Sequence, residues 1–243
     1  MALGALMALT AALSLPSTGA TCSYDAATAT LQAQMLSARI VVASAGDGRI
    51  LVDGRACATV AQTRQIIVAS AFAPAADAVV VDERRGRLAD PVTGRRPKLF
   101  ALTGAGGDTM EVIGTPGRDH YVARADLGAS IDLDADGDPD FVSTDAGRVV
   151  LRGMGGDDTL AAAAGPGDRM SQRAELDGGP GDDVLRGGRS GDDRLDGGPG
   201  DDRVLGRGAA GDRLAGGRGF DIVRADAGDT TTGFERTEPR RLP

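Results

Sequence analysis

Aspartates that follow glycine-rich turns at a regular interval are the residues in this chain whose spacing could do chemistry. From residue 178 to 224 the sequence reads GGPGDDVLR, GGRSGDDRLD, GGPGDDRVLG, RGAAGDRLA and GGRGFDIVR. Glycines allow a sharp turn with positive φ, and such a turn leaves its backbone carbonyls accessible. Calcium takes six to eight oxygen ligands, so a turn that offers carbonyls and a carboxylate suits it. The repeats therefore predict calcium sites at their turns.

The predicted ligands are the glycines of each turn and the aspartate that closes it. They are Gly178, Gly179, Gly181, Asp183, Gly187, Gly188, Gly191, Asp193, Gly197, Gly198, Gly200, Asp202, Asp212, Gly216, Gly219 and Asp221. If two units make one coil, the turns that begin at 178, 197 and 216 stack on one edge, and those at 187 and 208 stack on the other. Ions held between stacked turns then give about three sites.

An apolar residue follows each aspartate and predicts a short strand. These residues are Leu185 or Val184, Leu195, Val204 or Leu205, Leu214, and Val223. About three residues per strand cannot bury a face alone, so stacked coils must supply the core. Two other interpretations stay open: the segment is a disordered Gly/Asp/Arg-rich tail, or crowded carboxylates keep it disordered until calcium binds.

These units resemble the hemolysin-type calcium-binding repeat, the RTX nonapeptide family. The resemblance covers about a fifth of the chain. It implies an all-β fold, in which a right-handed parallel β-roll, or β-solenoid, of calcium-binding nonapeptide repeats follows a small cap region of β-strands.

Degenerate units precede the clean repeats. They read TGAGGDTM, GTPGRDHYV and GMGGDDTLA, with a fragment GPGDR at Gly165, and they place aspartates at Asp108, Asp119 and Asp158. The roll is therefore expected to begin well before the clean repeats, and we add Asp158 to the predicted ligands.

The acidic segment IDLDADGDPDFV contains a second candidate calcium site. Asp132, Asp134 and Asp136 alternate and are followed by Gly137, as in the first half of an EF-hand loop. The second half differs, because position twelve is Ser143 rather than glutamate. The alternative is an acidic turn between two strands.

Short β-prone runs between residues 22 and 70 predict strands that cap the open end of the solenoid. The segment from Asp82 to Lys98 has two prolines and no apolar period, which predicts an exposed loop. Its arginines are solvated or hold an anionic polymer.

Two cysteines in an exported chain favour a disulfide between Cys22 and Cys57, with two free buried thiols as the alternative.

An apolar run over residues 2–15, followed by small residues, predicts a secretory signal peptide at 1–20 and hence an extracellular protein. A lipid-modified Cys22 is the other possibility. The run is too short for a permanent anchor, so we expect no membrane span in the mature chain. The net charge of −8 argues against nucleic acid as a partner.

We divide the chain into five parts: the signal peptide at 1–20, an N-terminal β region at 21–101, degenerate repeats with the acidic loop at 102–170, nonapeptide repeats at 171–225, and a tail at 226–243.

His120 is the only histidine, so a zinc protease or a Ser-His-Asp hydrolase is not supported. We expect no enzyme but a secreted calcium-binding module whose partner is a cell-surface polymer or protein. The alternatives are a polysaccharide-active β-solenoid enzyme and a calcium-dependent adhesion or surface-layer component.

Overall fold

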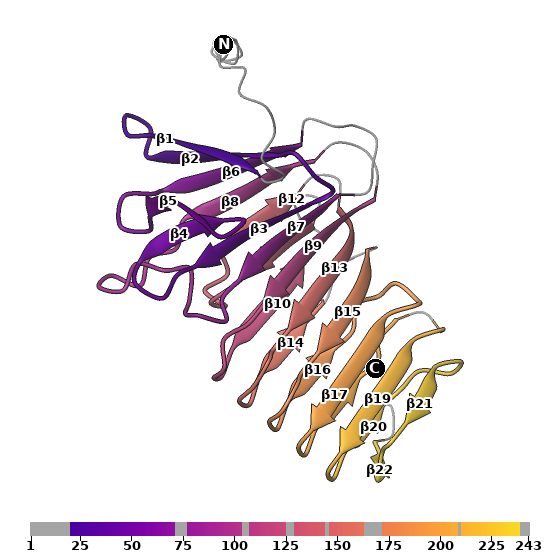
Figure 1. Ribbon diagram of the computed structural model, residues 1–243. Helices are drawn as coiled ribbons and strands as arrows, with labels where there is room; N and C mark the ends of the chain where they lie inside the picture. The colour runs from indigo at the N-terminus through magenta and orange to yellow at the C-terminus, as the bar shows by residue number, and fades with distance from the viewer. Residues whose placement is uncertain are drawn as a thin grey trace.

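The computed structural model describes residues 20–70, 77–103, 107–124, 129–143, 146–162, 172–208 and 210–238. Within these ranges the protein is built from β-strands and turns, with no helix. The strands form two sheets that lie face to face along the molecule (Figure 1) and share one apolar core. The all-β prediction is confirmed.

The first sheet has twelve strands and the second has ten. In spatial order the first contains β1 (Thr21–Asp25), β2 (Thr30–Met35), β6 (Gln65–Ser70), β8 (Lys98–Leu102), β12 (Phe141–Ser143), β11 (Ala129–Asp132), β10 (His120–Arg124), β14 (Thr159–Ala161), β16 (Val184–Arg186), β18 (Arg203–Leu205), β20 (Ile222–Arg224) and β22 (Arg236–Thr237). The second contains β21 (Thr230–Thr232), β19 (Arg213–Arg218), β17 (Arg194–Pro199), β15 (Arg173–Asp177), β13 (Ala146–Arg152), β9 (Asp108–Ile113), β7 (Ala78–Asp82), β3 (Arg39–Ser44), β4 (Arg49–Val52) and β5 (Arg55–Thr59).

Successive coils pair in parallel over most of the length. In the clean repeats Leu185 pairs with Val204 and Val204 with Val223, while Leu195 pairs with Leu214 in the other sheet. The repeat of one coil is 19 residues, so two units make one coil as the sequence predicts. Parallel stacking also extends back through β7 and β3 to the N-terminal region. Both sheets are mixed, because β1–β2, β3–β4–β5 and β10–β11–β12 pair antiparallel.

The core of the clean repeats is thin, because each short strand contributes one large apolar side chain. In each repeat at least one of the residues predicted to be buried is buried, with Leu185, Leu195 and Val204 fully so, whereas the alternative Val184 is half-buried. The arginines between them, such as Arg194, lie exposed on the outer faces. Since a coil buries its leucines only against its neighbours, a single coil has no core of its own.

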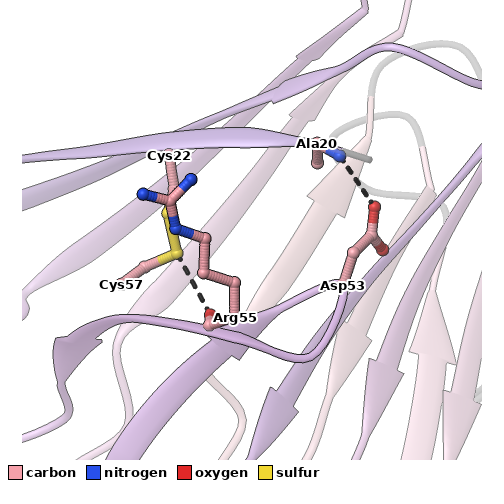
Figure 2. Close-up of a disulfide and its surroundings, with 5 residues drawn as sticks. All are labelled: Ala20, Cys22, Asp53, Arg55 and Cys57. Carbon is pink, nitrogen blue, oxygen red and sulfur yellow. Dashed lines mark hydrogen bonds between the residues drawn. A yellow bond between two sulfur atoms is a disulfide. The ribbon is translucent and has the colours of Figure 1, made fainter. Parts of the chain in front are cut away.

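A disulfide closes the N-terminal end of the stack. Cys22 lies on β1 and Cys57 on β5, which are the outermost strands of the first and second sheets. Figure 2 shows the bond between these strands and a nearby hydrogen bond of 3.1 Å from the backbone N–H of Ala20 to Asp53. The predicted pairing of the two cysteines is confirmed, and it joins the free edges of both sheets.

Reduction of this disulfide should destabilise the protein. The cysteines are 35 residues apart, and closing a loop of that size contributes about 3–4 kcal/mol in the chain-entropy model. We expect a lower melting temperature in reductant, or in the Cys22→Ser/Cys57→Ser variant, when calcium is held constant. A melting temperature that does not respond to reductant would contradict this expectation.

The segment between β7 and β8 is a loop, as the sequence predicts, but it is exposed only in part. Glu83, Leu88 and Arg96 are buried, and the guanidinium of Arg96 donates to Glu83 at 2.5 Å. The hydroxyl of Tyr121 donates to the other oxygen of Glu83 at 3.0 Å. The segment turns inward because its charged groups satisfy one another, which is the condition for burying an ion pair. Burial, together with the negative charge of Glu83, raises the pKa of Tyr121.

The predicted signal peptide lies outside the described residues, apart from its last residue, Ala20. Among the described residues there is no helix of the length and apolarity needed to cross a membrane.

Candidate metal centre

The aspartates that close the turns form two columns. The first column consists of Asp119, Asp158, Asp183, Asp202 and Asp221, each directly before a strand of the first sheet. The second column consists of Asp193 and Asp212, before β17 and β19 of the second sheet. All seven side chains are buried, with exposed fractions of 1% or less. Stacking therefore converts a sequence period into two rows of buried carboxylates.

Four carboxylates of the first column, those of Asp158, Asp183, Asp202 and Asp221, bridge two coils through their Oδ1 atoms. The backbone N–H of Asp158 donates to Asp183 at 2.7 Å, that of Asp183 donates to Asp202 at 2.8 Å, and that of Asp202 donates to Asp221 at 2.9 Å. In the second column the N–H of Asp193 donates to Asp212 at 3.0 Å. The predicted stacking of turns, 178 on 197 on 216 and 187 on 208, is what the structure contains.

The Oδ2 atoms divide the aspartates into two groups. In five of them Oδ2 is buried and has no hydrogen-bond partner among the described residues: Asp158, Asp183, Asp202, Asp212 and Asp221. No ion pair neutralises any of these five in the described part of the chain. A buried carboxylate oxygen without a partner is costly, so these atoms are candidate ligands for a cation.

In the second group both oxygens are satisfied. Asp193 accepts hydrogen bonds at Oδ1 from the N–H of Ala174 and at Oδ2 from the N–H of Gly188, both at 2.8 Å. Asp119 accepts at Oδ2 from the N–H of Thr115 at 2.6 Å, and Arg87 lies 3.4 Å from its Oδ1. Asp193 is a predicted ligand, but the structure gives it no oxygen that lacks a partner.

Backbone carbonyls converge on the free oxygens of the first column. A Cβ added to Gly178 would meet Asp183 Oδ2 and would lie 2.6 Å from the carbonyl oxygen of Gly197. Likewise, a Cβ added to Gly197 would meet Asp202 Oδ2 and would lie 2.5 Å from the carbonyl oxygen of Gly216. Each space thus combines one carboxylate and one carbonyl oxygen from adjacent coils, left open by the absent side chain. Hard oxygen donors of this kind fit calcium.

The other predicted glycines shape the turns. Gly179 and Gly181 donate their N–H groups to carbonyls of the next coil, and Gly188 donates to Asp193. Left-handed backbone angles occur at Gly179, Gly181, Gly198, Gly200 and Gly219. The turns that hold Gly187, Gly188 and Gly191 belong to the second column.

Burial dominates the titration of the free carboxylates. It raises the pKa of Asp158, Asp202 and Asp212 to about 7 and that of Asp183 to about 6, and neighbouring carboxylates add to the rise. Without a cation these groups therefore resist ionisation near neutral pH. A divalent cation beside Oδ2 would favour the ionised form.

A second, exposed row of aspartates runs beside the first column and was not predicted. The N–H of Asp182 donates to Asp157 at 3.2 Å, and that of Asp201 donates to Asp182 at 2.9 Å. These bonds run in the opposite direction along the stack from those of the buried column. The repeated Asp-Asp pair was the available signal: one residue lies inside the turn and the other on its rim.

The acidic loop between β11 and β12 is a separate candidate. Carboxylate oxygens of Asp132, Asp134 and Asp136 lie within 4.8 Å of one another. A positively charged side chain already lies beside this loop. The guanidinium of Arg124 is 3.4 Å from Asp132 Oδ2 and donates to the carbonyl of Gly137 at 3.0 Å. This loop is thus partly neutralised, unlike the five aspartates with a free Oδ2. The fragment at Gly165 lies outside the described residues.

Replacement of Gly200 by alanine should disrupt the stack. Gly200 has φ of 147°, and a Cβ there would overlap the carbonyl group of Gly181, with the carbonyl carbon at 2.6 Å. Gly54 is the matched control, because its φ is also positive, at 81°, but no atom lies within 4 Å of its added Cβ. We expect Gly54→Ala to cost about 1–2 kcal/mol from backbone strain alone and Gly200→Ala to cost clearly more, measured by urea unfolding in calcium. Equal losses would contradict this account.

Comparison with known proteins agrees with the geometry. No curated protein and no solved structure matches the chain. The RTX calcium-binding nonapeptide repeat family matches residues 134–167, 177–210 and 208–229. The match includes four of the five aspartates with a free oxygen in one continuous stretch, together with most of the acidic loop and the unit that contains Asp158. Residues 134–167 and 177–229 of this chain therefore match RTX calcium-binding nonapeptide repeats.

Proposed function

We propose that the protein is a secreted, non-enzymatic structural module that calcium organises into a right-handed parallel β-roll. The observation that supports this most is the row of buried Oδ2 atoms in the first column, each paired in space with a glycine carbonyl of the next coil. Calcium bound there would supply the positive charge that the row lacks.

The carboxylate geometry links ion binding to stacking. Oδ1 of Asp202 accepts the N–H of Asp183 in the preceding coil, while Oδ2 of the same group lies beside the carbonyl of Gly216 in the following coil. An ion held by Oδ2 and the carbonyl therefore ties three successive coils together. Binding free energy thereby becomes folding free energy.

Secretion fits this mechanism. The Cys22–Cys57 disulfide is typical of oxidising compartments, and extracellular calcium modules bind at about 10⁻⁴–10⁻³ M. Low calcium before export would leave the repeats loose, and higher calcium outside would set the roll. We also propose the division of the chain into the five parts defined from the sequence. Within it, residues 171–225 form the calcium-dependent segment and the Asp132 loop is a secondary calcium site.

The test is a calcium titration of residues 21–243 followed by far-UV circular dichroism, with magnesium as the control. A cooperative gain of β signal and of melting temperature with calcium, and not with magnesium, is the expected result. A protein that is equally folded and equally stable in chelator would refute calcium-dependent folding. Turnover of a polysaccharide by the purified protein would refute the non-enzymatic assignment.

A further inference from the structure

A pocket in the N-terminal part of the molecule is lined by basic side chains, although the chain as a whole carries a net charge of −8. The pocket has a volume of about 780 Å³ and lies between the β1–β2 turn, the loop before β6 and the loop before β8. Four of its lining residues are basic and none is acidic: Arg64, Arg95, Arg96 and Lys98. A cation would be repelled here, so the pocket plays no part in holding calcium.

Two of the four cations are already neutralised by the protein. The guanidinium of Arg96 donates to Glu83 at 2.5 Å, and both side chains are buried. The ammonium group of Lys98 lies 3.0 Å from a carboxylate oxygen of Asp138 and 3.0 Å from one of Asp140. These ion pairs hold the walls of the pocket in place, and their charges are not available to a ligand.

The other two cations have no carboxylate partner among the described residues. The side chain of Arg64 is exposed and makes no hydrogen bond or ion pair within that part of the chain. Arg95 is exposed as well, and its guanidinium donates to a neutral group, the backbone carbonyl of Thr63, at 3.0 Å. A guanidinium carries five N–H donors in a planar fork that fits a carboxylate. Two such groups that line one pocket form a binding place for anionic oxygens.

The backbone that carries the two free arginines is fixed. The N–H of Arg64 donates to the carbonyl of Ala29 at 2.8 Å, and its carbonyl accepts the N–H of Lys98 at 3.0 Å. The carbonyl of Arg95 accepts the N–H of Asp90 at 2.8 Å, which closes the turn before it. A ligand therefore orders only the two side chains on binding and not the loops, which lowers the entropic cost of association.

The remaining lining residues indicate the class of ligand. Three alanines contribute small apolar surfaces, and no large aliphatic side chain lines the pocket: Ala26, Ala29 and Ala61. The hydroxyl of Tyr24 donates to the carbonyl of Gln62 at 2.6 Å, which leaves its oxygen as an acceptor, and the side-chain amide of Gln62 adds N–H donors. The volume is that of a small-molecule site rather than of a single inorganic anion. Hydrogen-bonding groups with little apolar wall suit a hydroxylated anion, namely an acidic sugar.

We propose that Arg64 and Arg95 bind the carboxylate of an acidic sugar unit in an anionic polysaccharide, while Tyr24 and Gln62 contact hydroxyl groups of the same unit. The site lies outside residues 134–229, over which the calcium-binding repeats match, and uses none of the calcium ligands. It goes beyond the proposed function because it assigns the N-terminal region a partner of its own. The segment before β8 then has two roles: Arg96 anchors it in the core, and Arg95 holds the ligand.

The test is isothermal titration calorimetry of the full chain with a hyaluronan hexasaccharide, which carries glucuronate carboxylates, at physiological ionic strength and constant calcium. The variants are Arg64→Gln and Arg64→Gln/Arg95→Gln. Arg186→Gln/Arg213→Gln is the matched control, because it removes the same charge at exposed positions on β16 and β19. A neutral chitin hexasaccharide, inorganic phosphate and a hexaglutamate peptide separate a sugar site from other anion sites.

We expect the wild type to bind the acidic hexasaccharide and not the neutral one. Loss of one charge-assisted contact in Arg64→Gln should weaken binding about tenfold, and the double variant about a hundredfold, with an unchanged melting temperature. The control variant should bind as the wild type does. Equal weakening in the control, equally tight binding of phosphate or hexaglutamate, or no binding of the hexasaccharide would overturn the proposal. Because calcium is constant throughout, each of these outcomes leaves the calcium sites standing.

Discussion

The double variant Asp183→Asn/Asp202→Asn should lose a large part of its stabilisation by calcium and should be at least as stable as the wild type without it. In calcium, each site adds about 2.7 kcal/mol at 100 times its Kd, so two lost sites remove about 5 kcal/mol. Without calcium, the amide avoids the cost of burying a charge, and its NH2 group can donate to the carbonyl beside it. The two changes have opposite signs, which separates ion binding from general damage to the fold.

Asp193→Asn is the control for this prediction. The Asp193 carboxylate is equally buried, but both of its oxygens accept backbone N–H groups. Its amide would place a donor against a donor, so we expect lower stability in calcium and in chelator alike, with an unchanged difference between them. The measurement is urea unfolding at pH 7.5 in both conditions. If Asp193→Asn removes as much of the calcium increment as the double variant does, the assignment by free oxygens is wrong.

Calcium-free protein should lose stability as the pH rises from about 5 to 7.5. The pKa of Asp158, Asp202 and Asp212 is about 7 in the folded protein, compared with 3.8 for an ordinary aspartate. The folded state therefore binds more protons than the unfolded chain between these values, and the free energy of unfolding falls as the pH passes through them. The contribution is fully present near pH 4 and is lost above pH 7.

The expected change in the free energy of unfolding with pH is large for a protein of this size. One pKa unit is worth about 1.4 kcal/mol, so even a partial effect at several carboxyls amounts to an appreciable share of a typical 5–15 kcal/mol stability. Calcium should reverse the trend, because it favours the ionised groups and its binding releases protons. Melting temperatures in metal-depleted buffers from pH 4.5 to 7.5, with and without calcium, provide the check. A calcium-free melting temperature that rises over this range would contradict the mechanism.

The stacking of the clean repeats could be predicted from the sequence because it follows from their period. A unit of nine or ten residues fixes which turns share an edge, and it places Leu185 and Leu195 inside. The acidic loop was also located correctly between two strands, since its alternating aspartates interrupt an apolar pattern.

The state of each carboxylate oxygen could not be predicted in this way. Asp183 and Asp193 occupy equivalent places in the sequence pattern, but the turn before Asp193 is one residue longer and directs the N–H of Gly188 at its Oδ2. Glu83 and Arg96 are buried only because their charges meet, which composition cannot reveal.

The disulfide sets the order in which the coils of the stack fold. Because Cys22 and Cys57 covalently join the first strand of one sheet to the last strand of the other in spatial order, the relative placement of the two sheets is fixed at one end before any coil is added. Each later coil then only extends an existing template. The entropic cost of nucleation is therefore incurred a single time, when the N-terminal end forms. The molecule should therefore fold from its N-terminal end towards its C-terminal end and unfold in the reverse order, one coil of 19 residues at a time in the clean repeats.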